Sequence, residues 1–322
     1  MKEIKSYLAT QMAQVERTIT EALSSDVQLL DQTNRALREH PGKMLRPMLA
    51  LLCAGAVGKP NQDTIKYAAA TELLHNATLL HDDVVDGAEQ RRGLPTVASL
   101  LGGPAAVLIG DFWLVRAVRT ILEGSNNKND VISIFAATLS HLAEGELLQM
   151  EKATKADTTQ QDYERIIYGK TASLFETAAA SAALSVNASA EDTEAIRAFA
   201  RAIGMAFQIK DDIMDYGKAE IGKPTGIDLK EQKITQPLLC ALQDATPEEQ
   251  QKIRATVARI ADNPALAAEV QAFVKEYDGV AKAVTVLDKF IAQALSQLEK
   301  LAPSPEKLYL ARLAQFVGAR EN

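Results

Sequence analysis

The pattern Asp-Asp-x-x-Asp occurs twice in this sequence, and its spacing can bring carboxylates together at a reactive or ligand-binding site. The six carboxylates are those of Asp82, Asp83 and Asp86 in HDDVVD and of Asp211, Asp212 and Asp215 in KDDIMD. Each motif ends an apolar run with helical periodicity, so residues four apart lie on the same helix face. Carboxylates held this close repel one another unless a cation or a proton relieves them.

The ligand chemistry of these motifs favours Mg²⁺ over an all-protein calcium site. Mg²⁺ typically binds one or two carboxylates and leaves room for water and substrate phosphate. We therefore expect the two motifs to form two walls of one cavity, with metal ions and a phosphorylated ligand between them.

Arginines follow the first motif closely. Arg91 and Arg92 come five and six residues after Asp86, just before a glycine. Guanidinium groups make paired hydrogen bonds to phosphate oxygens. The alternative is a surface helix end whose basic residues complement the helix dipole. For the arginines alone that alternative is preferred, whereas next to the aspartates a metal–phosphate clamp is favoured.

A second basic group lies further upstream. Lys43 and Arg46 are three residues apart at a predicted helix start, where the helix N-terminus also attracts anions. His75 lies two helical turns before Asp82 and can donate a hydrogen bond to a diphosphate. In isolation, a capped helix start with solvated basic residues explains the first pair better, and a packed core histidine explains His75 equally well.

Further polar and basic residues surround the second motif: Lys170, Thr171, Gln208, Lys223 and Lys233. Each taken alone is an ordinary surface residue, but together they add positive charge near the second acidic motif. The glycine- and lysine-rich loop 217–226 either closes over a bound diphosphate or is a simple connector.

Composition predicts an all-α protein. The 322 residues are 47% apolar and 24% charged, only 5% are aromatic, and the net charge of −7 argues against nucleic-acid binding. The absence of a leader-like start and of an uncharged apolar run of membrane-spanning length predicts a soluble, cytoplasmic protein. Two cysteines without motif spacing fit a reducing compartment.

Helical periodicity extends along almost the whole chain, and no segment alternates long enough to predict a strand. We expect one all-helical domain over residues 1–322.

Several helices are apolar on more than one face, which predicts contact with a second copy of the chain. The predicted helices span 2–22, 26–38, 43–57, 62–86, 104–122, 129–151, 160–186, 190–216, 230–243, 248–262, 265–300 with a break, and 306–319.

Seven segments between positions 42 and 237 carry a resemblance to a known family. They are GKMLRP, ELLHNATLLHDDVVDGAEQRRGLPT, GDFW, GELLQM, YGKTASLF, FQIKDDIMDY and GKPTGIDLKEQKITQP. In this order they resemble the trans-isoprenyl (polyprenyl) diphosphate synthases, of the long-chain type. The resemblance implies the isoprenoid synthase fold, which is all-α around a central cavity, a homodimer, and Mg²⁺-dependent condensation of isopentenyl diphosphate with an allylic diphosphate.

The resemblance also implies residue roles. Asp82 and Asp86 would bind two Mg²⁺ ions and Asp211 a third, while Asp83, Asp212 and Asp215 would orient waters and basic partners. The allylic diphosphate would be held by Arg91, Lys170, Thr171, Gln208, Lys223 and Lys233. Isopentenyl diphosphate would be held by Lys43, Arg46, His75 and Arg92. Two positions depart from the family pattern: Met44 replaces a basic residue, and Gln232 replaces a glycine.

Product length is expected to depend on the residues one turn before the first motif. Ala77 and Thr78 are both small, whereas family members with short products tend to have an aromatic ring there. We therefore expect a long product of the kind attached to quinones, with Phe135, or less favourably Trp113, as the floor of the tail channel. The alternative is that the small residues only permit helix packing.

Three other functions compete with this interpretation. The first is a short-chain synthase that makes farnesyl or geranylgeranyl diphosphate. The second is a terpene cyclase or coupling enzyme, which has aspartate-rich helices but no need for isopentenyl diphosphate. The third is a non-catalytic subunit of a heteromeric synthase, which is expected to lack an acidic motif that this chain retains.

Overall fold

The computed structural model describes residues 1–39, 42–91, 93–217 and 226–319, and helices dominate them. The first half of the chain forms α1 (Lys2–Tyr7), α2 (Ala9–Ala22), α3 (Gln28–Glu39), α4 (Leu45–Val57), α5 (Gln62–Val85), β1 (Gln90–Arg91), β2 (Leu94–Pro95), α6 (Val97–Leu101), α7 (Gly103–Leu122) and α8 (Lys128–Lys155). The second half forms α9 (Gln160–Ile167), the π-helical segment η1 (Tyr168–Ala172), α10 (Ser173–Ser185), α11 (Ala190–Asp215), α12 (Ile227–Lys230), α13 (Gln236–Gln243), α14 (Pro247–Ala258), the 3₁₀ turn η2 (Pro264–Leu266), α15 (Ala267–Glu276), α16 (Gly279–Glu299) and α17 (Pro305–Ala319).

The chain divides into two compact units, and each contains one acidic motif. The first unit comprises Met1–Ala136, Thr177–Arg197 and Leu301–Leu310. The second comprises Ala137–Glu176, Ala198–Lys300 and the residues that follow Leu310. The prediction of an all-α fold is confirmed.

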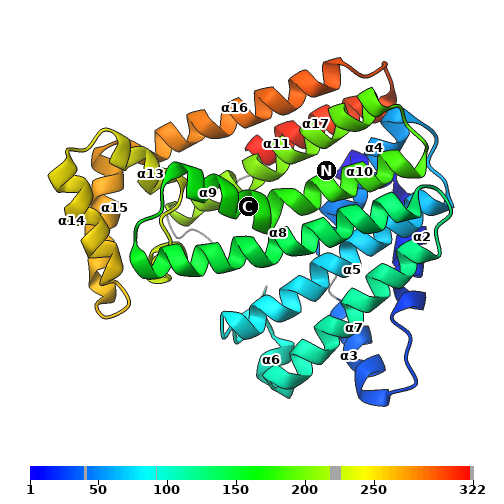
Figure 1. Ribbon diagram of the computed structural model, residues 1–322, viewed down its shortest axis with the longest axis horizontal. Helices are drawn as coiled ribbons and strands as arrows, with labels where there is room; N and C mark the ends of the chain where they lie inside the picture. Colours follow the sequence, from blue (N-terminus) through cyan, green and yellow to red (C-terminus); the bar gives the residue numbers. More distant parts are fainter. Residues whose placement is uncertain (40–41, 92, 218–225, 320–322) are drawn as a thin grey trace. The chain divides into compact units, whose positions relative to one another are not determined.

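In the first unit, α5 lies along α7 and also packs against α2 and α4 (Figure 1). Helix α5 begins at a capping box, in which the Asn61 side chain accepts hydrogen bonds from the Asp63 and Thr64 amides. Most of α4 is buried, as its continuous apolar sequence requires. These contacts fix the helix that ends at the first acidic motif.

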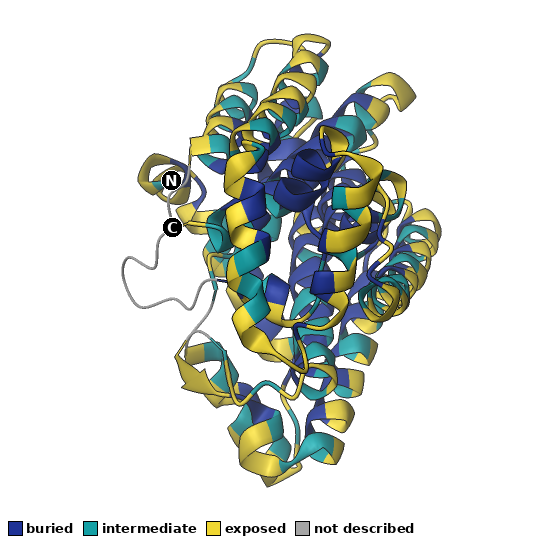
Figure 2. Cartoon of the chain, turned by 90° about the vertical axis from the view of Figure 1, so that its left-hand side faces the viewer, coloured by how far each residue is buried: buried dark blue, intermediate teal, exposed yellow. Residues whose placement is uncertain are grey.

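In the second unit, α13 packs on α15 and α16, and α9 packs near α13. Helix α9 begins at another capping box, made by Thr159 and Asp162. Figure 2 shows that most helices have buried residues on one side and exposed residues on the other. This one-sided burial is the pattern that amphipathic helices produce when they share a core.

Several details of the predicted elements are wrong. The expected helix 160–186 is interrupted by η1, and the expected helix 230–243 begins only at Gln236, because Pro237 fits the first turn of a helix and not its interior. A short antiparallel ladder joins β1 to β2, although no strand was predicted. Helix α4 begins at Leu45, after Met44 in a left-handed conformation, so Lys43 precedes the helix.

Helix α8 is the one helix in the described ranges that is long and apolar enough, by length and composition, to cross a membrane. This is weak evidence for a membrane span. Its apolar stretch is only 22% buried and the helix also carries Glu144 and Glu146. An apolar helix with so much exposed surface is also what an interface with another protein requires.

Candidate active site

The first acidic motif occupies the end of α5. Asp82 lies in the last turn and is half-buried, and Asp86 caps the helix and is exposed. The Asp86 amide donates to the Asp82 carbonyl oxygen at 2.8 Å, so helical geometry continues through both residues. The prediction that α5 brings these two residues into register one turn apart is confirmed.

Asp83 and Arg91 form an ion pair beside this motif. The Arg91 Nε donates to Asp83 Oδ1 at 2.7 Å, and Asp83 is only 5% exposed. The short β1–β2 ladder holds Arg91 in place, and the Thr96 hydroxyl donates to the Ala88 carbonyl oxygen at 2.7 Å at the base of this turn. The structure thus brings Arg91 to the motif, as predicted, whereas Arg92 lies outside the described residues.

The other predicted residues of the first unit have varied environments. His75 is half-buried on α5, Arg46 is half-buried in the first turn of α4, and Lys43 is exposed just before that helix. All three make polar or electrostatic contacts. Their role in binding isopentenyl diphosphate stays a prediction.

The candidate chain-length residues also lie in the first unit. Ala77 is fully buried on α5, and the Thr78 hydroxyl donates to the His75 carbonyl oxygen at 2.8 Å. Phe135 is buried. The Trp113 indole N–H donates to Asn34 Oδ1 at 2.8 Å, which ties α7 to α3. This bond gives Trp113 a structural role independent of any channel.

The second acidic motif ends α11, and its middle residue, Asp212, is the centre of a polar network. The Tyr163 hydroxyl donates to Asp212 Oδ2 at 2.5 Å, and Gln208 Nε2 donates to Asp212 Oδ1 at 2.9 Å. The Thr171 hydroxyl donates in turn to Gln208 Oε1 at 2.9 Å. The amide of Gln208 is therefore held at both ends, and the predicted residues Thr171, Gln208 and Asp212 do meet.

Burial dominates the electrostatics of this network. It raises the pKa of the Asp212 carboxyl, and the nearby Asp228 carboxylate raises it further. Burial also raises the pKa of Asp228, with Asp215 as the next cause. The hydrogen bonds from Tyr163 and Gln208 act in the opposite direction on Asp212. A nearby cation would relieve this crowding of carboxylates.

Asp215 has a different environment from Asp212. Its Oδ1 accepts from the Ile227 amide and its Oδ2 from the Asp228 amide, both at 3.1 Å. Its carbonyl oxygen also accepts from the Gly226 amide at 3.0 Å. Asp215 therefore fastens the end of α11 to the start of α12 and places Asp228 beside the motif.

The two predicted lysines that the structure describes in the second unit are paired with glutamates. The Lys170 ammonium contacts Glu146 Oε2, and the Lys233 ammonium contacts Glu231 Oε2. Gln149 Nε2 donates to Glu146 Oε1 at 3.1 Å, so both oxygens of Glu146 are used. Lys223 and most of the loop 217–226 lie outside the described residues.

A pocket of about 130 Å³ opens in the second unit, next to this network. That volume is enough for several water molecules, each of which takes up about 30 Å³ in the liquid. Charged groups of both signs and several isoleucines line it, which suits a ligand with an anionic end and an apolar end. Its lining includes Gln149, Tyr163, Lys170, Gln208, Asp212, Asp228 and Lys233.

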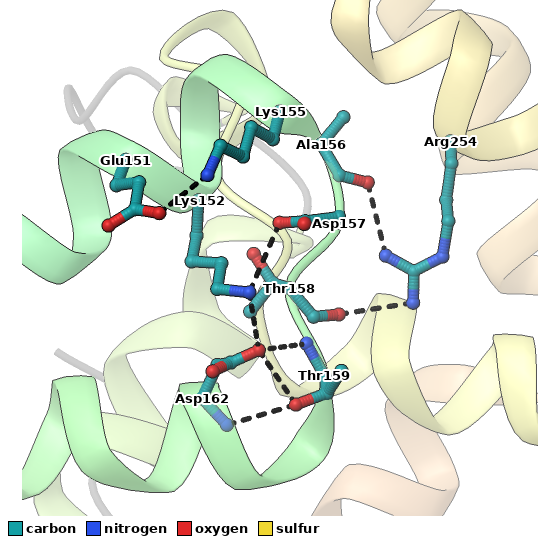
Figure 3. A network of polar contacts seen from close by, with 9 residues as sticks. All are labelled: Glu151, Lys152, Lys155, Ala156, Asp157, Thr158, Thr159, Asp162 and Arg254. Atoms are coloured by element: carbon teal, nitrogen blue, oxygen red, sulfur yellow. Dashed lines mark hydrogen bonds and ion pairs between the residues drawn. The ribbon is translucent and has the colours of Figure 1, made fainter.

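A network of polar contacts holds the corner between α8 and α9 (Figure 3). Arg254 of α14 donates to the carbonyl oxygens of Ala156 and Thr158 at 3.1 and 3.0 Å. Lys152 contacts Asp157 at 3.3 Å and Asp162 at 3.0 Å. Because Thr158 lines the pocket, these contacts hold its wall in place.

The donor chemistry of the two motifs fits Mg²⁺. Within the described ranges, no three His, Cys, Asp or Glu side chains converge into a complete metal cage. Mg²⁺ needs no such cage, because it binds a few carboxylates and completes its octahedron with water and phosphate oxygens. Half-buried Asp82 and Asp211, each one turn before another aspartate, are of this kind.

Three residues were missed from the sequence: Tyr163 and Asp228, which line the pocket, and Glu146, which contacts Lys170 of its lining. Glu146 and Asp228 do lie within the quoted segments GELLQM and GKPTGIDLKEQKITQP, so a signal was present. Tyr163 offered no signal, because its partner Asp212 is 49 residues away in the chain.

Comparisons with known proteins agree on one family. The polyprenyl synthetase family model matches residues 27–277. The chain is 39% identical to octaprenyl diphosphate synthase of Escherichia coli over 259 residues, which is 80% of each protein. Among solved structures, a decaprenyl diphosphate synthase from Rhodobacter capsulatus matches with a TM-score of 0.92 and 34% identity, over 100% of this chain and 99% of that one.

A polyprenyl synthase from Caulobacter crescentus, solved with calcium and isoprenyl diphosphate, matches with a TM-score of 0.90 and 32% identity. The match covers 100% of this chain and 98% of the Caulobacter protein. The isoprenoid synthase fold implied by the resemblance is confirmed. The chain belongs to the polyprenyl synthetase family and is a polyprenyl diphosphate synthase, a prenyltransferase.

Proposed function

We propose that this protein catalyses Mg²⁺-dependent, sequential 1′–4 head-to-tail condensation of isopentenyl diphosphate with an allylic diphosphate, giving a long-chain all-trans polyprenyl diphosphate that serves as a quinone side-chain precursor. The observation that carries the proposal is the Thr171–Gln208–Asp212–Tyr163 network. It joins the YGKT segment to the second acidic motif inside a pocket with lysines.

Three Mg²⁺ ions fit the proposal. Asp82 and Asp86 would hold two of them and Asp211 the third. When bound, the ions would act as Lewis acids that neutralise charge on the allylic diphosphate. Asp83 contacts Arg91, Asp212 contacts Gln208, and Asp215 anchors α12, so these three aspartates would act as positioning residues.

Basic and polar side chains of the chain would supply the rest of the electrostatic stabilisation. Arg91, Lys170, Thr171, Gln208, Lys223 and Lys233 would hold the allylic diphosphate, and charge that grows on this group as the C–O bond breaks is stabilised by such preorganised donors. Lys43, Arg46, His75 and Arg92 would hold isopentenyl diphosphate. The proton lost after carbon–carbon bond formation would pass to the released diphosphate, so no protein base is assigned.

Residues next to the first motif would set product length. Ala77 and Thr78 are small, so the growing tail is expected to pass them, with Phe135 further along as the candidate floor. The long-chain synthases among the matched proteins support this expectation.

The proposed assembly is a homodimer in the cytoplasm. Leu108, Val115 and Leu122 on α7 are exposed and seven residues apart, so they form one apolar stripe. A second copy of the chain is the partner that this stripe suits. The two units would act as one catalytic domain, because each carries one of the acidic motifs.

Product analysis tests the proposal. The purified chain alone is incubated with labelled isopentenyl diphosphate, an allylic primer and Mg²⁺, and the dephosphorylated products are separated by chain length. We expect long-chain products that disappear on chelation of Mg²⁺ or omission of isopentenyl diphosphate. Products formed from the allylic primer alone would indicate a cyclase. If the purified chain were inactive, it would be a non-catalytic subunit. Products of three or four isoprene units would indicate a short-chain synthase.

The same assay applied to Ala77→Tyr tests the chain-length residues. Because the tyrosine ring would enter the path proposed for the tail, the main product is expected to shorten. An unchanged length distribution in this variant would contradict the role of Ala77 and leave the reaction type untouched.

A further inference from the structure

Glu146 is the acidic residue of GELLQM, a segment to which the proposed function assigns no role. It lies on α8 and is half-buried, with its side chain 20% exposed. Its Oε2 contacts the Lys170 ammonium and its Oε1 accepts from Gln149 Nε2 at 3.1 Å. Both Gln149 and Lys170 line the pocket, so Glu146 contacts two residues of its lining.

The backbones on either side fix this arrangement. A Cβ on Gly145 would meet the Lys170 amide nitrogen at 3.1 Å, and a Cβ on Gly169 would meet the His141 carbonyl oxygen at 2.5 Å. Helix α8 and η1 therefore touch backbone to backbone where Glu146 and Lys170 project. The backbone is therefore fixed where both charged side chains begin. This favours a fixed ion pair over a chance contact at the surface.

The charges around the Glu146–Lys170 pair affect how the pocket binds a diphosphate. Lys170 is already matched by one carboxylate, and Asp212 and Asp228 line the same pocket. An incoming diphosphate must share the ammonium with Glu146 and is repelled by its charge. The pair keeps Lys170 in position and at the same time reduces the attraction that the pocket exerts on a diphosphate.

We propose that Glu146 is a positioning residue that limits how tightly the pocket holds diphosphate, so that inorganic diphosphate can leave after each condensation. This inference rests on the proposed binding of the allylic diphosphate by Lys170. Chain elongation makes such a limit useful, because one inorganic diphosphate must depart for every isoprene unit added.

The variant that tests this role is Glu146→Gln, which removes the charge and keeps the shape. Binding of inorganic pyrophosphate with Mg²⁺, measured by isothermal titration calorimetry, is expected to tighten about tenfold. The KM for the allylic substrate should fall, and kcat in multiple turnover should fall with it, while the single-turnover rate stays close to that of the wild type. A purely structural role would not tighten binding.

Two further variants serve as controls. Glu144→Gln makes the same charge change at an exposed position of the same helix and is expected to leave pyrophosphate affinity unchanged. Glu146→Asp keeps the charge and is expected to restore an affinity within about threefold of the wild type. Unchanged or weaker pyrophosphate binding in Glu146→Gln would overturn the inference, as would equal tightening in Glu144→Gln.

Lys170→Ala separates this inference from the proposed function. If Lys170→Ala weakens pyrophosphate binding and Glu146→Gln does not tighten it, only the role of Glu146 is wrong. If Lys170→Ala leaves pyrophosphate binding unchanged, the assignment of Lys170 to the diphosphate is wrong, and the inference is wrong with it.

Discussion

The three aspartates of one motif have three different surroundings. Asp211 is half-buried, Asp212 is buried and hydrogen-bonded through both oxygens, and Asp215 accepts two backbone amides at the start of α12. A carboxylate whose oxygens are already used is less suited to bind a metal directly. Asp212 and Asp215 are therefore proposed as positioning residues, and Asp211 keeps the metal-binding role that the family resemblance implies.

Separate substitutions should distinguish a ligand from an anchor within this motif. Asp211→Ala is expected to lower kcat by about two orders of magnitude or more, because the proposed Mg²⁺ ligand is lost. Asp215→Ala removes a cap and should destabilise the fold by about 1 kcal/mol. Steady-state kinetics over a Mg²⁺ titration and urea unfolding measure the two effects.

Each of these two substitutions serves as the control for the other, because both remove one carboxylate from the same helix end. Near-normal turnover in Asp211→Ala would contradict its assignment to the metal. A Mg²⁺ requirement that rises as strongly in Asp215→Ala as in Asp211→Ala would show that Asp215 is a ligand rather than an anchor.

At the scale of elements, the corner between α8 and α9 depends on one arginine. Arg254 holds the carbonyl oxygens of Ala156 and Thr158, and both residues are buried. Arg254→Ala leaves these oxygens without their donor, and an unsatisfied buried group costs about 1–3 kcal/mol. We expect a loss of about 2 kcal/mol in urea unfolding and a higher KM for the allylic substrate, because Thr158 lines the pocket.

Arg259→Ala is the matched control for this prediction. Arg259 is an exposed arginine that follows α14, and its loss is expected to change the free energy of unfolding by less than about 0.5 kcal/mol. Equal stability of Arg254→Ala and Arg259→Ala would mean that the corner does not depend on the two carbonyl contacts.

Most helices could be predicted from the sequence, because apolar periodicity and Gly–Pro punctuation are local signals. The ends of α5 and α11 follow from the motifs that terminate them. The π-helical segment could not be predicted, since it occurs where Gly169 approaches α8, far away in the chain. The β1–β2 ladder was missed because two-residue strands have no detectable alternation, although Gly93 at φ +78° marks its turn.

The candidate site was predictable only in part. The residue types and spacing of the two motifs indicate metal and phosphate chemistry, and YGKT and Gln208 were expected beside the second motif. The partners that hold these groups, Glu146 for Lys170 and Tyr163 for Asp212, depend on which helix faces come together. Periodicity predicts that a face is buried but does not say which residue it meets.

At the scale of the whole molecule, its apolar surface bears on assembly. Leu108 is 68% exposed and belongs to the stripe with Val115 and Leu122 on α7, whereas Leu308 on α17 is 66% exposed. Single exposed leucines are common on soluble proteins, whereas a stripe at seven-residue spacing is the kind of surface that the proposed dimer would cover. Leu108 and Leu308 thus have nearly equal exposure, but only Leu108 belongs to an apolar stripe.

Leu108→Asp is expected to convert the proposed dimer to monomers, because a carboxylate would have to be desolvated in the centre of an apolar interface. Leu308→Asp makes the same chemical change at nearly equal exposure and should leave the proposed dimer intact. Sedimentation velocity at micromolar concentration measures both, and circular dichroism checks that the helices remain. A wild-type monomer, or a dimer that survives Leu108→Asp, would show that the α7 stripe is not where two copies meet.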